Sequence, residues 1–147
     1  RVWHGGAVIG ADNEINGITF GGGGAATIVD HCGVGFSLGG GFEFFGGTVN
    51  ARYLSSLFLG DDAFDFDDGY VGTIQFAVAM VGHTGHHGLE VDSKRGATEA
   101  LPRSMPILRS FTVVGGGASG RRASLAHFRE GPGIAAAART AVSRRPC

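Results

Sequence analysis

Short apolar segments recur along this chain at a spacing of about 22 residues, and Phe42 aligns with Phe64 one period later. In both copies an acidic residue stands between two aromatic residues, in GFEFFGG at 41–47 and AFDFDDG at 63–69. Apolar and polar residues alternate within each segment, which is typical of a β-strand with one buried face. No other feature of the sequence constrains the fold as strongly as this period.

The repeat extends beyond these two segments. The further alignments are Cys32 with Leu54 and Phe76, Val34 with Ser56 and Val78, Phe36 with Phe58 and Met80, and Phe44 with Phe66. A third copy at 88–92 follows a short insertion, a weaker early copy lies at 17–20, and a later strand at 111–114 resembles 76–79. The polar segment 92–104 predicts a loop that bulges out of one coil.

This pattern predicts an all-β fold, a right-handed parallel β-helix of about four or five coils. Like residues then stack about 4.8 Å apart on neighbouring coils, and each coil needs its neighbours to bury its inward face. A β-sandwich does not account for similarity at a fixed period. A doubly wound α/β fold requires amphipathic helices, and residues 1–115 contain no convincing one.

Composition divides the chain into two parts. Its 147 residues suit one domain, and its 28 glycines suit many turns. We expect a β-helix domain over residues 1–120 and an Ala- and Arg-rich tail, foreign to that domain, over 121–147. The run Ala135–Arg139 predicts a short C-terminal helix. No apolar run is long enough for a transmembrane helix, and two cysteines cannot form a disulfide framework.

Charge is distributed unevenly between these parts. Residues 1–100 carry 12 acidic and 4 basic side chains, whereas residues 101–147 carry 1 acidic and 8 basic side chains. A basic segment can attract nucleic acid, but here no basic stripe alternates with stacking aromatic residues. We therefore expect no nucleic-acid partner.

Four segments resemble a group of bacterial secreted or outer-surface proteins that are expected to form right-handed β-helices and have no firmly assigned activity. The segments are NEINGITF at 13–20, GFEFFGGTVNARYL at 41–54, GDDAFDFDDGYVGTIQF at 60–76 and PRSMPILRSFTVVG at 102–115. The resemblance covers roughly residues 1–120 and implies an extracellular or outer-surface location. The chain departs from the pattern at 33–40, where glycines replace polar and acidic residues, and the pattern fades after Gly120.

The alternation also predicts a column of outward-pointing carboxylates. Because Phe42 and Phe44 point inward, Glu43 must point outward, and the repeat stacks equivalent residues on it. The column comprises Thr19, Glu43, Asp65 and Glu90, with Asp67 and Asp92 beside it. We expect this column to be exposed to solvent.

Like charges at this spacing repel, which leaves three interpretations. A cation such as Ca²⁺ bridges the carboxylates, and its candidate ligands are Asp61, Asp62, Asp65, Asp67, Glu90 and Asp92. Alternatively, Glu43, Asp65 and Glu90 act as the acid and base of a glycosidase, because neighbouring coils give suitable carboxyl separations. In the third interpretation the side chains extend into solvent and bind nothing.

Two further motifs suggest chemistry. The cluster His83–His87 places His86 and His87 beside Asp61 and Asp62 on the neighbouring coil, a set that suits Zn²⁺, although its spacing matches no known zinc signature. The alternative is an ordinary surface turn.

The second motif, GFSLG at 35–39, matches G-x-S-x-G, the nucleophile elbow of α/β-hydrolases, but a strand-like segment follows where a helix is required. A convergent triad would pair Ser37 with His86 or His87 and with Asp62. A serine in a glycine-flanked turn is the alternative.

Two classes of function follow. The first is a secreted or cell-surface module that binds a cation or a carbohydrate through its acidic face. The second is a hydrolase, either a serine esterase that uses Ser37 or a glycosidase that uses the carboxylate column. We expect no organic cofactor, and we expect homo-oligomers formed through the open ends of the β-helix or an apolar side.

Overall fold

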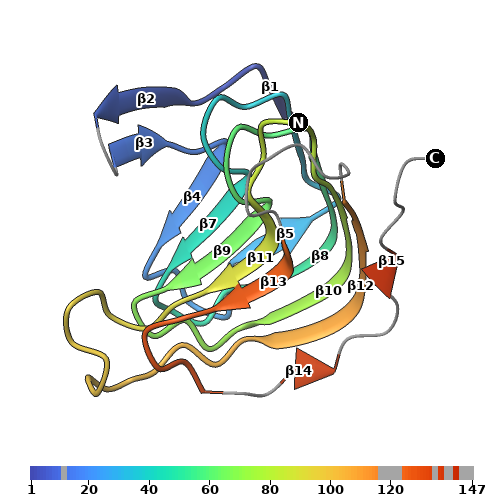
Figure 1. The fold of residues 1–147 in the computed structure, drawn as a ribbon. Helices are drawn as coiled ribbons and strands as arrows, with labels where there is room; N and C mark the ends of the chain where they lie inside the picture. Colours follow the sequence, from blue (N-terminus) through green and yellow to red (C-terminus); the bar gives the residue numbers. More distant parts are fainter. Residues whose placement is uncertain (11–12, 116–123, 134–135, 138–140, 143–147) are drawn as a thin grey trace.

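The computed structural model describes residues 1–10, 13–115, 124–133, 136–137 and 141–142. Two sheets and one hairpin contain all the strands of this described part (Figure 1). The long-strand sheet comprises β1 (Val2–Trp3), β5 (Ile28–Asp30), β6 (Gly33–Gly35), β8 (Asn50–Leu57), β10 (Thr73–Met80), β12 (Ile107–Val114), β14 (Ala136–Ala137) and β15 (Ala141–Val142). The five-stranded sheet comprises β4 (Ile18–Gly21), β7 (Phe42–Phe45), β9 (Phe64–Asp67), β11 (His87–Val91) and β13 (Ser124–Phe128).

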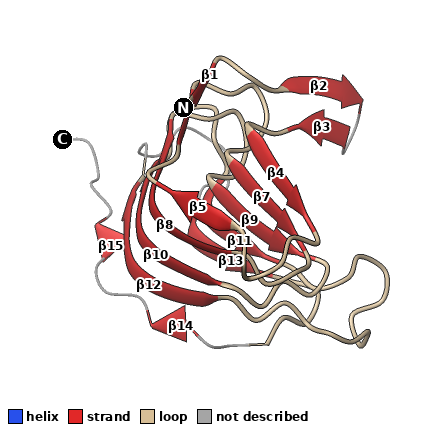
Figure 2. Cartoon of the chain, turned by 180° about the vertical axis from the view of Figure 1, so that it is seen from behind, coloured by secondary structure: helices blue, strands red, loops and turns tan. Residues whose placement is uncertain are grey.

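The chain passes alternately between the two sheets, and each strand pairs in parallel with its equivalent one coil away. Two sheets wound in this way form the predicted right-handed parallel β-helix, whose layers lie face to face in Figures 1 and 2. The antiparallel hairpin of β2 (Ala7–Gly10) and β3 (Asn13–Ile15) projects from its first coil. None of the described residues forms a helix that could cross a membrane.

Stacked aromatic rings fill the space between the sheets. The rings of Phe42 and Phe64 are 5.3 Å apart and nearly parallel, at 5°, and those of Phe44 and Phe66 are also 5.3 Å apart. All four side chains are at most 1% exposed. Burying a side chain of this size contributes about 2–3 kcal/mol, so this inward ladder is a principal source of stability.

The predicted register is correct in the five-stranded sheet and wrong by one residue in part of the other. Leu54 pairs with Ala77, where the repeat predicted Phe76, and Ser56 likewise pairs with Ala79. The turn between β9 and β10 contains one more residue than the turn between β7 and β8, because Tyr70 folds into the core and donates a hydrogen bond to the carbonyl of Val49 at 2.7 Å. The same offset pairs Ala77 with Phe111, although Phe76 was the expected equivalent.

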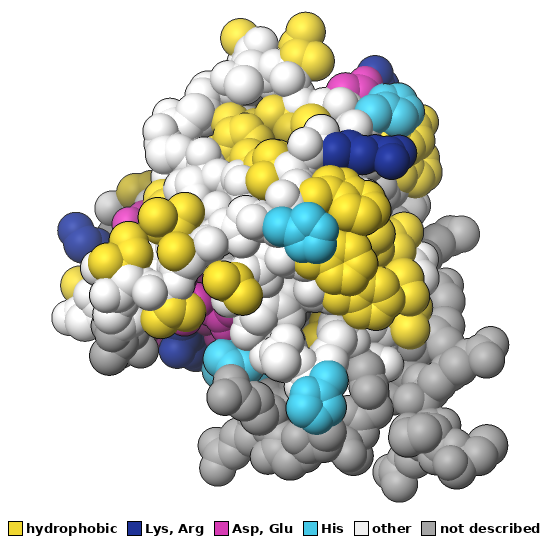
Figure 3. All heavy atoms as spheres, turned by 90° about the horizontal axis from the view of Figure 1, so that it is seen from above, with side chains coloured by type: hydrophobic (Ala, Val, Ile, Leu, Met, Phe, Trp, Pro, Cys, Tyr) yellow, Lys and Arg dark blue, Asp and Glu magenta, His cyan; other side chains and the backbone are white. Residues whose placement is uncertain are grey.

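Aromatic residues also mark the bends of the long strands. His31, Tyr53 and Phe76 have positive φ angles of 53°, 55° and 58°, and their rings stack at 4.5 and 5.0 Å. Such a conformation is costly for a side-chain-bearing residue, so its repetition at equivalent places indicates a bend on which the winding depends. Figure 3 shows hydrophobic side chains gathered on one face, where acidic side chains reach the surface only in small patches.

The C-terminal region differs from the sequence prediction. Ser124–Phe128, assigned to the tail, forms β13 and pairs with β11, so the five-stranded sheet continues past residue 120. The expected helix at 135–139 is wrong where it can be assessed, because Ala136–Ala137 forms β14 against β12. The remaining residues of that helix, Ala135, Ala138 and Arg139, lie outside the described residues.

Candidate functional site: an acidic cleft

The outer face of the five-stranded sheet carries titratable side chains in three columns. Asp62, Asp65 and Asp67 all point away from the core, because Ala63, Phe64 and Phe66 between them are buried. The same arrangement recurs on each coil, so outward residues stack on outward residues. The central column is Thr19, Glu43, Asp65, Glu90 and His127; one flanking column is Phe45, Asp67, Asp92 and Arg129, and the other is Asp62, His87 and Ser124.

Small residues make this arrangement possible at the start of each strand. A Cβ atom at Gly41 would lie 2.1 Å from the hydroxyl oxygen of Ser56, and one at Gly88 would lie 2.3 Å from a methyl group of Val113. The equivalent residue on the coil between them is Ala63. Two consecutive residues can therefore point inward, and the side chains on either side of them both point outward.

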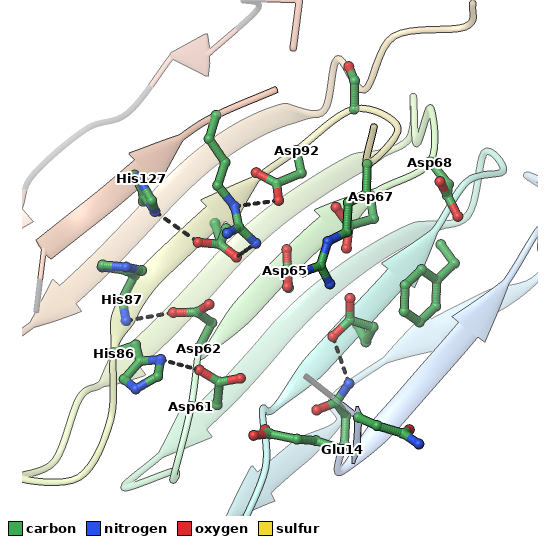
Figure 4. Close-up of a pocket in the computed structure, with 18 residues that line it drawn as sticks. Glu14, Asp61, Asp62, Asp65, Asp67, Asp68, His86, His87, Asp92 and His127 are labelled. Atoms are coloured by element: carbon green, nitrogen blue, oxygen red, sulfur yellow. Dashed lines mark hydrogen bonds and ion pairs between the residues drawn. The ribbon is translucent and has the colours of Figure 1, made fainter. Parts of the chain in front are cut away.

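These columns form the floor of a cleft of about 570 Å³, here called the acidic cleft. It is lined by nine carboxylates, three histidines, two arginines and four other residues: Glu14, Glu43, Asp61, Asp62, Asp65, Asp67, Asp68, Glu90, Asp92, His86, His87, His127, Arg95, Arg129, Asn13, Asn16, Phe45 and Ser93. Figure 4 shows these side chains converging from neighbouring strands. The excess of carboxylates makes this the most acidic region of the described chain.

The prediction that the column is exposed holds for Thr19 but is wrong for its two glutamates, and Asp65 between them is half-buried. Glu43 and Glu90 are each only 6% exposed, and Asp92 is 5% exposed. The hairpin of β2 and β3 contributes Glu14 to one wall, and the loop after β11 contributes Ser93 and Arg95 to another. Neither wall follows from the 22-residue repeat, because both are departures from it.

Glu90 on β11 and Asp92 directly after this strand pair with side chains of the next coil. One carboxylate oxygen of Glu90 lies 2.8 Å from Nδ1 of His127, and the other accepts a hydrogen bond from Nη2 of Arg129 at 2.8 Å. Nε of Arg129 also donates to Asp92 at 2.6 Å. The last described coil therefore supplies the positive charge for the coil before it (Figure 4).

The carboxylates of β7 and β9 are stabilised differently. Glu43 accepts a hydrogen bond from Nδ2 of Asn16 at 2.7 Å, whereas Oδ1 of Asp65 is buried without a hydrogen-bond partner. Burial, followed by repulsion from Asp67, raises the pKa of Glu43 to about 9. Burial and the charge of Glu43 raise the pKa of Asp65 well above its ordinary value. Burial and the charge of Asp92 raise the pKa of Asp67 to about 7.

The predicted pairing of histidines with aspartates is present. Nδ1 of His86 contacts Asp61 at 2.5 Å, and the backbone N–H of His87 donates to Asp62 at 2.6 Å. Burial and the charge of Glu90 raise the pKa of Asp62 to about 8, while burial lowers the pKa of His87. His83 is exposed and does not line the acidic cleft, so it does not belong to this group.

Four groups of three side chains have donor atoms within 4.8 Å of one another among the described residues. They are Glu43–Asp65–Asp67, Asp62–Asp65–Glu90, Asp61–Asp62–His86 and His87–Glu90–His127. The first two contain only oxygen donors, which suit Ca²⁺. The last contains two imidazoles, which suit a transition metal. Every residue predicted as a cation ligand lines this one cleft.

The structure does not assemble the predicted serine triad. Ser37 is 3% exposed, and its hydroxyl oxygen has no hydrogen-bond partner, so it contacts neither His86 nor His87. It does not line the acidic cleft, and the next strand is β7 rather than the helix that a nucleophile elbow requires. Its placement is that of a buried turn residue, which corrects the esterase prediction.

Sequence reasoning missed His127 and Arg129, which complete the cleft. Glu90 and His127 are neighbours in the sheet although 37 residues separate them, against 22 between Glu43 and Asp65. The basic composition of the C-terminal segment was the only signal for these residues. It indicated positive charge without indicating where that charge lies.

The fold and the cleft together define the class of protein: a parallel β-helix with an acidic cleft on the outer face of one sheet. The family described as "Pectate-lyase like beta helix domain" matches residues 1–142, and the chain belongs to this family. No curated protein and no solved structure matches the chain significantly.

Proposed function

We propose that the acidic cleft binds a divalent cation of the Ca²⁺ type through Glu43, Asp65 and Asp67. The observation that carries this proposal is the buried Oδ1 of Asp65, which has no hydrogen-bond partner and lies between two other carboxylates. A buried carboxylate oxygen without a partner is costly, and a cation with oxygen ligands removes that cost for several carboxylates at once.

The location implied by the sequence resemblance is consistent with this function. Outside the cell, calcium modules operate with dissociation constants of about 10⁻⁴–10⁻³ M, so a site that keeps some water ligands is sufficient. We therefore propose a secreted or cell-surface β-helix module whose acidic cleft is closed and neutralised by the cation.

Calcium titration of the full chain tests the proposal. We expect Ca²⁺ at millimolar concentration to raise the melting temperature at pH 7.5 and Asp65→Asn to abolish the increase. Asp30→Asn is the matched control, because Asp30 pairs with Arg52 and does not line the acidic cleft. An equal increase in both variants, or none in the unmodified protein, would contradict calcium binding at this site.

A second candidate, glycoside hydrolysis, is favoured by one observation. Glu43 is protonated near neutral pH, as a general acid must be, and its carboxyl oxygens approach those of Asp65 within 4.8 Å. This proximity is nearer to the carboxyl separation of about 5–5.5 Å in retaining enzymes than to the wider one of inverting enzymes. Phe45, which is 40% exposed at the cleft, offers an aromatic face for a sugar ring.

Release of reducing sugar from a panel of neutral and acidic polysaccharides tests this candidate. Glu43→Gln should abolish release while Asp30→Asn retains it, and release should persist in EDTA. Absence of release from the whole panel, or release that survives Glu43→Gln, would exclude Glu43 as the acid.

A further inference from the structure

Two imidazoles and one carboxylate meet at the end of the acidic cleft that is farthest from the hairpin. His87 and Glu90 extend from β11, and His127 extends from β13, where it pairs with Glu90 in the sheet. One donor atom of each lies within 4.8 Å of the others, and the rings of His87 and His127 are 4.7 Å apart. In Figure 4 His87 and His127 lie on the same side of the cleft.

We propose that His87, Glu90 and His127 form a second metal site, for a divalent transition metal of the Zn²⁺ class. Two histidines and one carboxylate are a donor set of catalytic zinc sites and of non-haem iron sites, in which the remaining positions stay open to water or substrate. This set differs from the all-oxygen group of the proposed calcium site, and none of its three residues belongs to Glu43, Asp65 and Asp67.

The distances require only small movements. Nδ1 of His127 lies 2.8 Å from Oε1 of Glu90. Zinc–nitrogen and zinc–oxygen bonds of about 2.0–2.2 Å place tetrahedral ligand atoms roughly 3.3–3.5 Å apart. A metal therefore separates His127 and Glu90 slightly, and His87 approaches them by at most about 1.5 Å.

Neighbouring residues already hold the ligands as a metal site requires. Arg129 binds Oε2 of Glu90, which leaves Oε1 for the metal, and Arg129 is itself fixed by Asp92. Nδ1 of His87 lies 2.8 Å from the hydroxyl oxygen of Ser124, and in the tautomer in which Nδ1 donates a proton to that oxygen, Nε2 keeps its lone pair for the metal. Such supporting contacts orient metal ligands and increase their affinity.

The exposure of this group and its donor atoms also suit a transition-metal site. The side chain of His127 is 43% exposed, so an ion can enter from solvent, whereas the side chain of Glu90 is 8% exposed. The competing group Asp61–Asp62–His86 contains a single imidazole, which makes it the weaker transition-metal site. The site therefore differs from the zinc site that the His83–His87 cluster suggested.

Cobalt substitution locates the metal. Tetrahedral Co²⁺ with nitrogen ligands absorbs in the visible range, so we titrate the full chain with Co²⁺ and measure Zn²⁺ affinity by calorimetry. We expect a visible band in the unmodified protein, and loss of that band with at least tenfold weaker Zn²⁺ binding in His127→Asn. His86→Asn, the matched control, should retain both.

The outcomes separate this site from the calcium site. Asp65→Asn should keep the Co²⁺ band, and His127→Asn should keep the calcium-dependent increase in melting temperature. A band that survives His127→Asn but disappears in His86→Asn would place the metal at Asp61 and Asp62 and overturn the proposal. Absence of any band or zinc heat from the unmodified protein would also overturn it and would leave the calcium proposal unaffected.

Discussion

The two faces of the five-stranded sheet obey the same geometry with opposite energetic results. On the inward face Phe42 stacks on Phe64, and one residue away on the outward face Glu43 stacks on Asp65. Stacking of rings buries apolar surface and is favourable. Stacking of carboxylates places like charges one strand apart and is unfavourable unless protons or cations neutralise them.

This difference separates residues that stabilise the fold from residues whose burial the fold alone does not explain. The inward ladder is explained by stability alone. The outward ladder costs stability, and burial by the hairpin and the loop after β11 increases that cost, as the raised pKa values of Glu43 and Asp65 show. Perturbed carboxyl groups gathered in one cleft are a feature of functional sites.

The largest effect should come from the inward ladder. Phe64→Ala removes a ring that is 0% exposed and contacts the rings of Phe42 and Phe111, so we expect a loss of about 3–5 kcal/mol in the free energy of unfolding. Chemical denaturation measures it. Phe58→Ala, at a ring that is 43% exposed, should cost much less, and equal losses would show that the inward stack is not the main source of stability.

The stacked carboxylates on the outer face of the five-stranded sheet should make the protein less stable as pH rises. Asp67, Asp62 and Glu43 have pKa values near 7, 8 and 9 in the folded protein, whereas unfolded carboxyl groups titrate near pH 4. The folded state therefore holds more protons than the unfolded state over this range, and stability falls as pH rises. His87, whose pKa is lowered, opposes this trend only at more acidic pH.

In EDTA we expect a loss of about 3–5 kcal/mol, or roughly ten degrees or more in melting temperature, between pH 6.5 and pH 8.5, the upper figure being what the three pKa values give for independent groups. Added Ca²⁺ should reduce the loss, because a cation takes over the neutralisation from the protons. A melting temperature that is constant or rises over this range would show that the carboxylates are ionised at little cost.

The next largest loss of stability should come from removing the positive charge of Arg129, directly after β13. Arg129→Gln leaves Glu90 and Asp92, both almost fully buried, without their guanidinium partner. We expect a loss of about 1–2 kcal/mol at pH 7.5 by chemical denaturation. Arg52→Gln removes an exposed ion pair to Asp30 and should have a smaller effect, so a reversed order would contradict the role given to Arg129.

The fold could be predicted from the sequence because two patterns agree. The alternation of apolar and polar residues indicates strands, and the 22-residue period indicates that these strands stack coil on coil. Equal spacing placed Glu43 beside Asp65, and the short insertion before Gly88 still allowed Glu90 to be aligned with them. The register prediction failed where one turn contains an additional residue, since Tyr70 enters the core there.

The site was less predictable because its walls and its basic residues come from departures from the repeat. The hairpin residue Glu14 and the loop residue Arg95 have no equivalents on other coils. His127 and Arg129 follow an interval of 37 residues, for which no alignment at 22 residues can account. Burial of the column, which changes the pKa values, depends on these same elements.

The smallest expected effect is a substitution that stabilises the protein, although most substitutions destabilise. In EDTA at pH 7, Asp65→Asn should stabilise the protein by about 1 kcal/mol, because an amide of the same shape requires no proton uptake when the protein folds. The advantage should grow as pH rises towards the raised pKa of Asp65. In Ca²⁺ the order should reverse, since the variant lacks a ligand and the unmodified protein gains binding energy. Thermal unfolding in EDTA and in Ca²⁺ measures both states, and a variant that is less stable in EDTA would show that Asp65 stabilises the fold without a cation.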